Sequence, residues 1–156
     1  MLLEIRHLTS NDVPLMEALL ITFGTAFNEV ETYTGNCPSH SYLQRLLSSN
    51  MFIALAALKN DEVVGGIAAY ELMKFEQERS EIYIYDLAVA AEHRREGIAT
   101  ALIEKLQDIA AERGAYVIFV QADMGVEDRP AIALYTKLGK REDVLHFDIK
   151  VPTRSP

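Results

Sequence analysis

One segment, residues 81–113, constrains the fold and chemistry of this chain more than any other. A strand-like run leads into a basic turn and then into an amphipathic helical pattern that starts at Gly97. Such a turn directs backbone N–H groups and the positive end of a helix dipole at one point. Gly97 has no Cβ, so an anion can approach the backbone there. The segment predicts an anion site, the alternative being an ordinary solvated helix start.

Composition narrows the class of protein. The 156 residues are 49% apolar and 24% charged, which predicts one globular domain over residues 1–156. A formal net charge of −8 argues against nucleic acid as a partner and suits a cationic small molecule. No apolar run is long enough to cross a membrane and the N-terminus does not resemble a secretory signal, so we expect a cytoplasmic protein without a membrane partner.

Cysteine and histidine usage predicts no metal site. The single cysteine, Cys37, cannot form an intramolecular disulfide, and it lies in a loop-like Gly-Asn-Cys-Pro stretch. The four histidines show no spacing typical of metal ligands.

Hydrophobic periodicity predicts a mixed α/β fold. Strands are expected over residues 3–8, 51–58, 62–75, 81–89, 115–120 and 142–149, and helices over 12–27, 42–47, 97–113 and 128–139. Residues 28–39 are expected to form a loop, and Asn60-Asp61 a hairpin turn. Leu15, Leu19 and Ile21 should face the core. The apolar segment 115–120 is expected to be a central strand covered on both faces.

The turn matches a known cofactor motif. Arg94, Gly97 and Ala99 resemble the acyl-CoA-binding signature of the GCN5-related N-acetyltransferases, and the predicted order of elements is that of the same family. The resemblance implies a central, mostly antiparallel sheet of six to seven strands, flanked by helices, in which parallel strands four and five splay apart around the cofactor. It implies acetyl-CoA as co-substrate. The residues expected to bind acetyl-CoA are Leu87, Ala88, Val89, Arg94, Arg95, Glu96, Gly97, Ile98, Ala99 and Thr100.

Two carboxylates on the strand before the motif are candidates for the general base. Strand alternation puts Asp86 on the side of Ile82 and Ile84, where an apolar face would raise its pKa. The alternatives are that Asp86 accepts backbone hydrogen bonds or binds a cation without moving a proton. Glu81 is the second candidate; it falls on the opposite face by parity, unless a β-bulge changes the count.

The helix over residues 128–139 carries the expected general acid. The resemblance places Tyr135 beside the cofactor sulfur, where its phenol can donate a proton to the departing thiolate. Packing in the core is the alternative for this side chain. Asp128 takes the place where many relatives carry Asn, and we expect it to cap the helix and to lie near pantetheine.

Longer stretches resemble one subgroup, the class I aminoglycoside 3-N-acetyltransferases (gentamicin acetyltransferases). They include residues 52–57, 74–77, 79–89, 120–123 and 133–139. This resemblance implies acetylation of a 2-deoxystreptamine aminoglycoside at its 3-amino group, antibiotic resistance and a homodimer. Residues expected to line an acidic cleft for this substrate are Glu29, Glu31, Tyr33, Glu81, Asp86, Gln121 and Asp123, although Glu29 and Glu31 also suit a solvated loop. Other readings are an acetyltransferase for another amine or a protein N-terminus, and a non-catalytic acyl-CoA sensor.

Overall fold

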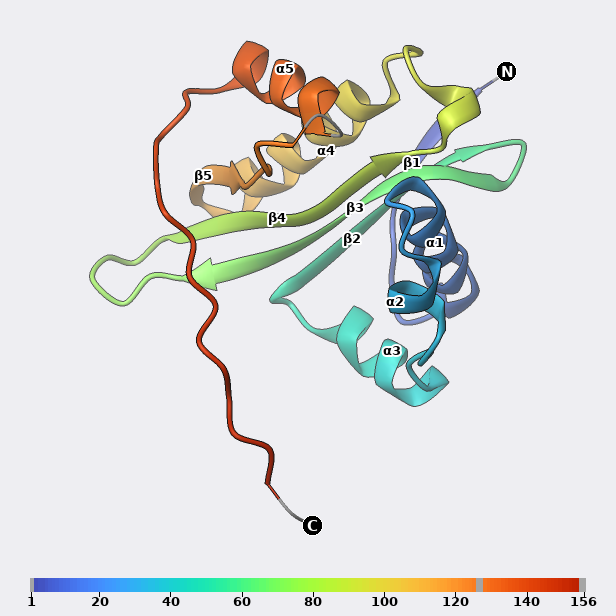
Figure 1. Ribbon diagram of the computed structural model, residues 1–156, viewed down its shortest axis with the longest axis horizontal. Coiled ribbons are helices and arrows are strands. Elements are labelled where there is room, and N and C mark those ends of the chain that lie inside the picture. Colours follow the sequence, from blue (N-terminus) through green and yellow to red (C-terminus); the bar gives the residue numbers. More distant parts are fainter. Residues whose placement is uncertain (1, 126–127, 155–156) are drawn as a thin grey trace. The chain divides into compact units, whose positions relative to one another are not determined.

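A computed structural model describes residues 2–125 and 128–154. The chain forms two compact units, residues 1–121 and 122–156, which are described separately. The elements of the first unit are β1 (Leu3–His7), α1 (Val13–Ala26), α2 (Val30–Thr34), α3 (His40–Ser48), β2 (Phe52–Lys59), β3 (Glu62–Met73), β4 (Ser80–Val89), a 3₁₀ turn (Ala91–His93), α4 (Ile98–Arg113) and β5 (Ala115–Val120) (Figure 1). The second unit contains α5 (Arg129–Leu138).

The first unit is built on one mixed sheet with the strand order β1-β2-β3-β4-β5. Neighbouring strands from β1 to β4 are antiparallel, and β4 and β5 are parallel, joined by the crossover helix α4. This confirms the mixed α/β class and the parallel pair. The β2–β3 hairpin turns at Asn60 and Asp61, whose φ values of 50° and 64° are those of the predicted tight turn.

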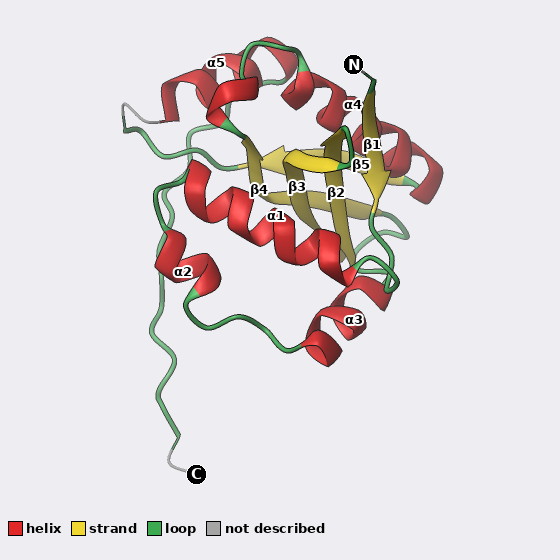
Figure 2. Ribbon diagram, turned by 90° about the vertical axis from the view of Figure 1, so that its right-hand side faces the viewer, coloured by secondary structure: helices red, strands yellow, loops and turns green. Residues whose placement is uncertain are grey.

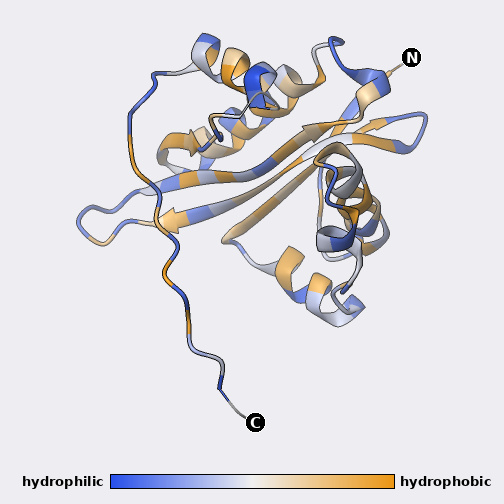
Figure 3. Cartoon of the chain, in the orientation of Figure 1, coloured by the Kyte–Doolittle hydropathy of each residue, from blue (hydrophilic) through white to orange (hydrophobic). Residues whose placement is uncertain are grey.

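The described residues contain five strands, fewer than the six to seven expected. Residues 142–149 carry no regular secondary structure, so the predicted last strand is wrong. Apolar and polar residues do alternate along this C-terminal segment (Figure 3), and Leu145 and Ile149 are highly exposed. Alternation shows that a segment can present one apolar face, but a strand also needs a hydrogen-bonding neighbour, which alternation does not supply.

Helices α1 and α4 cover opposite faces of the sheet (Figure 2). On the α1 face, Leu19 and Phe23 pack in one cluster with small strand residues, including Ala54, Ala56, Ala68 and Ala88. The buried residues of α4 are Ile98, Leu102, Ile103, Leu106, Ile109 and Ala110. Ile21 is 58% exposed, so its predicted place in the core is wrong; the buried stripe of α1 runs through Val13, Met16, Leu19 and Phe23.

Two further predictions are corrected. β5 is an edge strand of the sheet, not a central strand covered on both faces, and Tyr116 and Val117 are 48% and 38% exposed. An apolar sequence can arise in an edge strand that has one face on the core. The segment 28–39 is not all loop either, because it contains the short helix α2.

Gly66 on β3 lets α1 approach the sheet. A Cβ at this position would lie 2.4 Å from Cδ1 of Leu19 and 2.5 Å from the backbone oxygen of Leu55. The Leu55 oxygen belongs to the paired strand β2 and cannot move independently. Gly66 therefore serves helix packing, whereas a Cβ at Gly65 would lie 2.8 Å from the Ala88 backbone oxygen of β4.

Gly66→Ala should lower the free energy of unfolding by about 1–3 kcal/mol, the usual cost of overpacking. Urea denaturation followed by circular dichroism measures this change. Gly125→Ala is the matched control, since no atom lies within 4 Å of its Cβ position. Equal stability of the two variants would show that α1 tolerates the added methyl group.

Candidate active site

The predicted anion loop lies between β4 and α4. Gly97 is the N-cap of α4 with φ of 81°, and Arg95 also has a positive φ, 64°. Residues 94–97 are exposed, and no atom lies within 4 Å of the Cβ position of Gly97. The loop therefore presents open backbone and two arginines at a helix N-terminus, which fits a phosphate group.

The loop is attached to the end of β2 by an ion pair between Lys59 and Glu96. Hydrogen bonding to the ammonium group lowers the pKa of Glu96. Nδ1 of His93 lies 3.6 Å from the same carboxylate. Lys59 thus neutralises the one acidic side chain of the Arg94–Gly97 turn. Lys59 was not predicted as part of this loop, because a contact across 37 residues leaves no local pattern in the sequence.

β4 loses its neighbour β5 halfway along. The parallel pairing runs from Ser80–Ala115 to Ile84–Val120, whereas the pairing of β4 with β3 continues to Val89. Along Leu87, Ala88 and Val89, one edge of β4 is therefore left without a β5 partner. β5 pairs with β4 along its whole length and ends at Val120, so the expected splaying of this pair stays a prediction. An extended ligand can hydrogen-bond to the edge of β4 that lies beyond β5.

A β-bulge on β4 sets the direction of Asp86. Asp86 lies opposite Ala68 on β3 while Ile84 lies opposite Ala69, so Tyr85 is an extra residue. The bulge reverses the parity, and Asp86 shares the α1 face with Ala68 instead of the face of Ile84. The predicted side of Asp86 is therefore wrong. The alternative considered for Glu81 is confirmed, since the bulge brings both carboxylates to one face.

Tyr33 on α2 donates a hydrogen bond to Oδ2 of Asp86 at 2.8 Å. Its ring packs against Phe23 and Phe27 at centroid distances of 6.1 and 5.8 Å. Gly24 allows this approach, because a Cβ there would lie 3.2 Å from Cβ of Tyr33. Tyr33 was expected to contact the substrate, and the structure shows that it holds Asp86.

The surroundings of Asp86 shift its acidity in both directions. Burial raises the pKa of its carboxyl, the hydrogen bond from Tyr33 lowers it, and the charge of Glu29 raises it; the net shift is upward. Burial and the bond to Asp86 raise the pKa of Tyr33, so this phenol keeps its proton. Asp86 is a half-buried carboxylate with raised basicity, which is a property of general bases.

The structure places Glu81 in a different setting. Nζ of Lys74 lies 2.8 Å from Glu81 and 3.5 Å from Glu76, so Glu81 belongs to an ion-pair cluster near the β3–β4 turn. Glu81 and Asp86 are roughly 15 Å apart along the strand at the usual rise per residue. They cannot both contact one small amine.

The other predicted substrate residues are only partly brought together. Glu29 stands at the N-cap position of α2 without a side-chain capping hydrogen bond, and its charge raises the pKa of Asp86. Glu31 lies against Gly35 at the end of α2. Gln121 accepts a hydrogen bond from the Tyr83 hydroxyl at 3.0 Å.

The remaining predicted residues belong to the second unit. Asp128 is the N-cap residue of α5, as predicted, but its side chain accepts a hydrogen bond from the backbone N–H of Asp123 at 2.8 Å and does not cap the helix. Tyr135 lies on α5, as predicted, and is half-buried. Their predicted contacts with the cofactor stay predictions.

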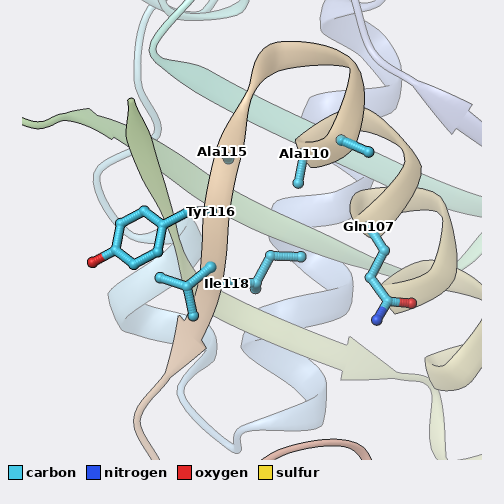
Figure 4. Close-up of a pocket in the computed structure, with 7 residues that line it drawn as sticks. Gln107, Ala110, Ala115, Tyr116 and Ile118 are labelled. Atoms are coloured by element: carbon cyan, nitrogen blue, oxygen red, sulfur yellow. The ribbon is translucent and has the colours of Figure 1, made fainter. Parts of the chain in front are cut away.

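A cavity of about 280 Å³ lies between α4 and β5 (Figure 4). Tyr116, Val117 and Ile118 line it from β5, opposite Ala110 and Gln107 of α4. None of the predicted site residues lines it. Residues 2–125 and 128–154 contain no cluster of side chains able to hold a metal ion, and no helix among them is both long and apolar enough to cross a membrane.

Comparison with known proteins gives one family. The sequence pattern that defines the acetyltransferase (GNAT) family matches residues 16–140. An aminoglycoside acetyltransferase from an uncultured soil metagenomic sample is 70% identical, with a TM-score of 0.96 over 97% of this chain and 100% of that chain.

Two more distant structures share the fold. A second soil metagenomic aminoglycoside acetyltransferase, solved in complex with sisomicin, is 33% identical, with a TM-score of 0.87 over 96% of this chain and 97% of that chain. The ribosomal-protein-alanine N-acetyltransferase from Brucella melitensis biovar Abortus 2308 is 24% identical, with a TM-score of 0.76 over 97% of this chain and 100% of that chain. The latter similarity shows the fold alone.

Tyr33→Phe should raise the pKa of Asp86, because the lost hydrogen bond stabilises the ionised carboxylate. Carbon NMR of labelled aspartate side chains, followed over pH, measures this change. Tyr116→Phe is the control, since Tyr116 lies on β5 beneath Arg79. An unchanged or lower pKa in Tyr33→Phe would remove Tyr33 from the control of Asp86.

Proposed function

The chain belongs to the acetyltransferase (GNAT) family, and on this premise we propose that it transfers an acetyl group from acetyl-CoA to the 3-amino group of the 2-deoxystreptamine ring of aminoglycosides such as gentamicin. One observation supports this chemistry most directly. The pKa of the Asp86 carboxyl is raised, and Asp86 lies directly before the part of β4 that does not pair with β5. An amine beside Asp86 and an acyl donor along that edge can meet. The 70% identity to an aminoglycoside acetyltransferase supports the acceptor class.

The donor, acetyl-CoA, is the acyl donor used by the family. Its pantetheine arm would pair with the backbone of Leu87, Ala88 and Val89 as an added strand. Its pyrophosphate would accept hydrogen bonds from the amides of residues 95–99, with Thr100 at the end of the row and the charges of Arg94 and Arg95 beside it. The open space at Gly97 supports this placement.

Asp86 would act as general base. An alkyl amine of pKa near 10 is only about one part in a thousand neutral at pH 7, a penalty of roughly 4 kcal/mol. The carboxylate takes a proton from the ammonium group, directly or through water, and the neutral nitrogen attacks the thioester carbonyl. A backbone N–H at or near Val89 would polarise that carbonyl.

Tyr135 would act as general acid. When the tetrahedral intermediate collapses, the C–S bond breaks and the C–N bond remains. The thiolate then takes the phenolic proton of Tyr135, since a phenol is protonated at neutral pH. The nitrogen releases its second proton to solvent as the amide forms. Asp128 would lie near the pantetheine arm.

The acceptor is a polyamine sugar. Acidic and polar groups proposed to contact its ammonium groups are Glu29, Glu31, Tyr33, Glu81, Gln121 and Asp123. The sisomicin complex of the 33%-identical relative supports this acceptor class. Acetylation removes one positive charge and adds bulk, which would weaken binding to ribosomal RNA and cause antibiotic resistance.

Incubation with acetyl-CoA and gentamicin should give one monoacetylated product, with the acetyl group on the 3-amino nitrogen as located by NMR. Spermidine and an N-terminal peptide serve as competing acceptors in parallel reactions. Acetylation at another amino group would overturn the regiochemistry only. Turnover with spermidine or the peptide alone would overturn the acceptor class, and tight CoA binding without any turnover would indicate a sensor.

Asp86→Asn and Tyr135→Phe should each reduce turnover by about ten- to thousandfold, the range of general acid–base catalysis. Glu81→Gln is the comparison variant for the base, because Lys74 already engages Glu81. Calorimetry with CoA should show unchanged binding in Asp86→Asn. Full activity of Asp86→Asn together with loss in Glu81→Gln would reverse the assignment of the base.

We further propose that the protein is a homodimer. The outer edge of β5 has no partner strand among the described residues, and the C-terminal segment exposes Leu145, Phe147 and Ile149. Exposed apolar side chains and open strand edges are typical of association surfaces. Light scattering on the purified protein should give twice the monomer mass. The monomer mass at micromolar concentration would contradict this.

A further inference from the structure

A continuous row of aromatic rings crosses the sheet beside Asp86. Phe52, Tyr70, Tyr83 and Phe119 lie directly opposite one another on β2, β3, β4 and β5. They therefore point to one face. The Phe52–Tyr70 centroids are 5.3 Å apart, and Tyr83 and Phe119 stack at 4.7 Å with an angle of 2°.

Tyr85 joins this row because of the β-bulge. As the extra residue of β4, it has no opposite residue on β3. Its ring lies edge-on to Tyr70 and Tyr83, at 5.9 Å from each. The side chain is 62% exposed, so most of it is available to a ligand.

The row and Asp86 occupy the same face. Phe52 and Ala68, which mark that face, pack in the α1 cluster, and Asp86 lies opposite Ala68. The charge of Asp86 also raises the pKa of Tyr70 and of Tyr83, although burial is the main cause in both. The tyrosine hydroxyls remain neutral beside the base.

This surface suits one kind of ligand. Aromatic faces attract ammonium groups, and flat rings bury the C–H groups of a saturated ring at low entropic cost. Nearby carboxylates, Asp86 and Glu29, add negative charge. A rigid multi-ring polyamine can use all three contributions at once, whereas a single small ring offers less C–H surface and fewer ammonium groups to the aromatic row.

We propose that Tyr70, Tyr83 and Tyr85 bind the sugar rings of the acceptor that do not carry the reacting amine, with Tyr85 as the main contact. This inference rests on the proposed aminoglycoside acetylation and adds the subsite that selects multi-ring acceptors. Asp86 then handles the amine, and the tyrosine row distinguishes an aminoglycoside from its isolated central ring.

The test compares acceptors of different size. Tyr85→Ala should raise KM for sisomicin and gentamicin by about three- to thirtyfold, the size of one cation–π contact. For 2-deoxystreptamine, the central ring alone, KM should change less than twofold. kcat should stay within twofold for all acceptors, because Tyr85 takes no part in proton transfer. Tyr85→Phe should keep the wild-type KM, since it keeps the ring.

Phe75→Ala is the matched control. Phe75 is 98% exposed at the β3–β4 turn, and its loss should leave both KM values unchanged. Thermal melts should show all three variants folded. A rise of KM for sisomicin without one for 2-deoxystreptamine supports the subsite.

Several results would overturn the inference. Three outcomes would each exclude a ring-binding role. They are an unchanged KM for sisomicin in Tyr85→Ala, an equal rise of KM for both acceptors in that variant, and a rise of KM in Tyr85→Phe as large as the rise in Tyr85→Ala. In these cases the wild type still acetylates aminoglycosides and the proposed function stands. If the wild type binds CoA but acetylates no aminoglycoside, the proposed function fails and the subsite fails with it.

Discussion

The β-bulge at Tyr85 is the feature on which the acceptor side of the site depends. Without the extra residue, alternation along β4 would turn Asp86 toward the buried layer of Ile82 and Ile84. A carboxylate with no partner in an apolar layer costs several kcal/mol and would be neutral. The bulge instead moves Asp86 to the α1 face, where Tyr33 donates a hydrogen bond, and leaves Tyr85 exposed. One inserted residue therefore produces both a basic carboxylate and an accessible ring.

β4 can serve two ligands because a strand has two independent surfaces. Side chains point out of the sheet, whereas backbone donors and acceptors point along it. The side chain of Asp86 points out of the sheet. The backbone groups of Leu87, Ala88 and Val89 have no β5 partner along the sheet, since pairing with β5 ends at Ile84. Nε of Arg94 lies 3.4 Å from the Val89 carbonyl, so the predicted anion loop begins at the end of the same edge. Donor and acceptor can therefore approach one strand without competing for it.

Features governed by local backbone chemistry were predicted from the sequence. Gly97 stands at the start of α4 with a positive φ value, and Asn60-Asp61 makes the hairpin turn. Features that need a partner distant in the sequence were not predicted. Tyr83 and Tyr85 are the same residue type, and nothing local marks one of them as the bulge. The Tyr33–Asp86 bond spans 53 residues, so the sequence suggested both residues for the site but not the contact between them.

The environment of Asp86 balances two requirements of a general base. A fully buried carboxyl would keep its proton and could not accept another, whereas a fully exposed one would be too weak a base. Burial raises the pKa of Asp86, and the Tyr33 hydroxyl lowers it again. An arriving ammonium group would also favour the ionised carboxylate, because opposite charges stabilise each other in a partly desolvated site. The positive charge of the proposed acceptor would therefore favour the ionised form of Asp86 that the proposed base role requires, and neutral amines would lack this effect.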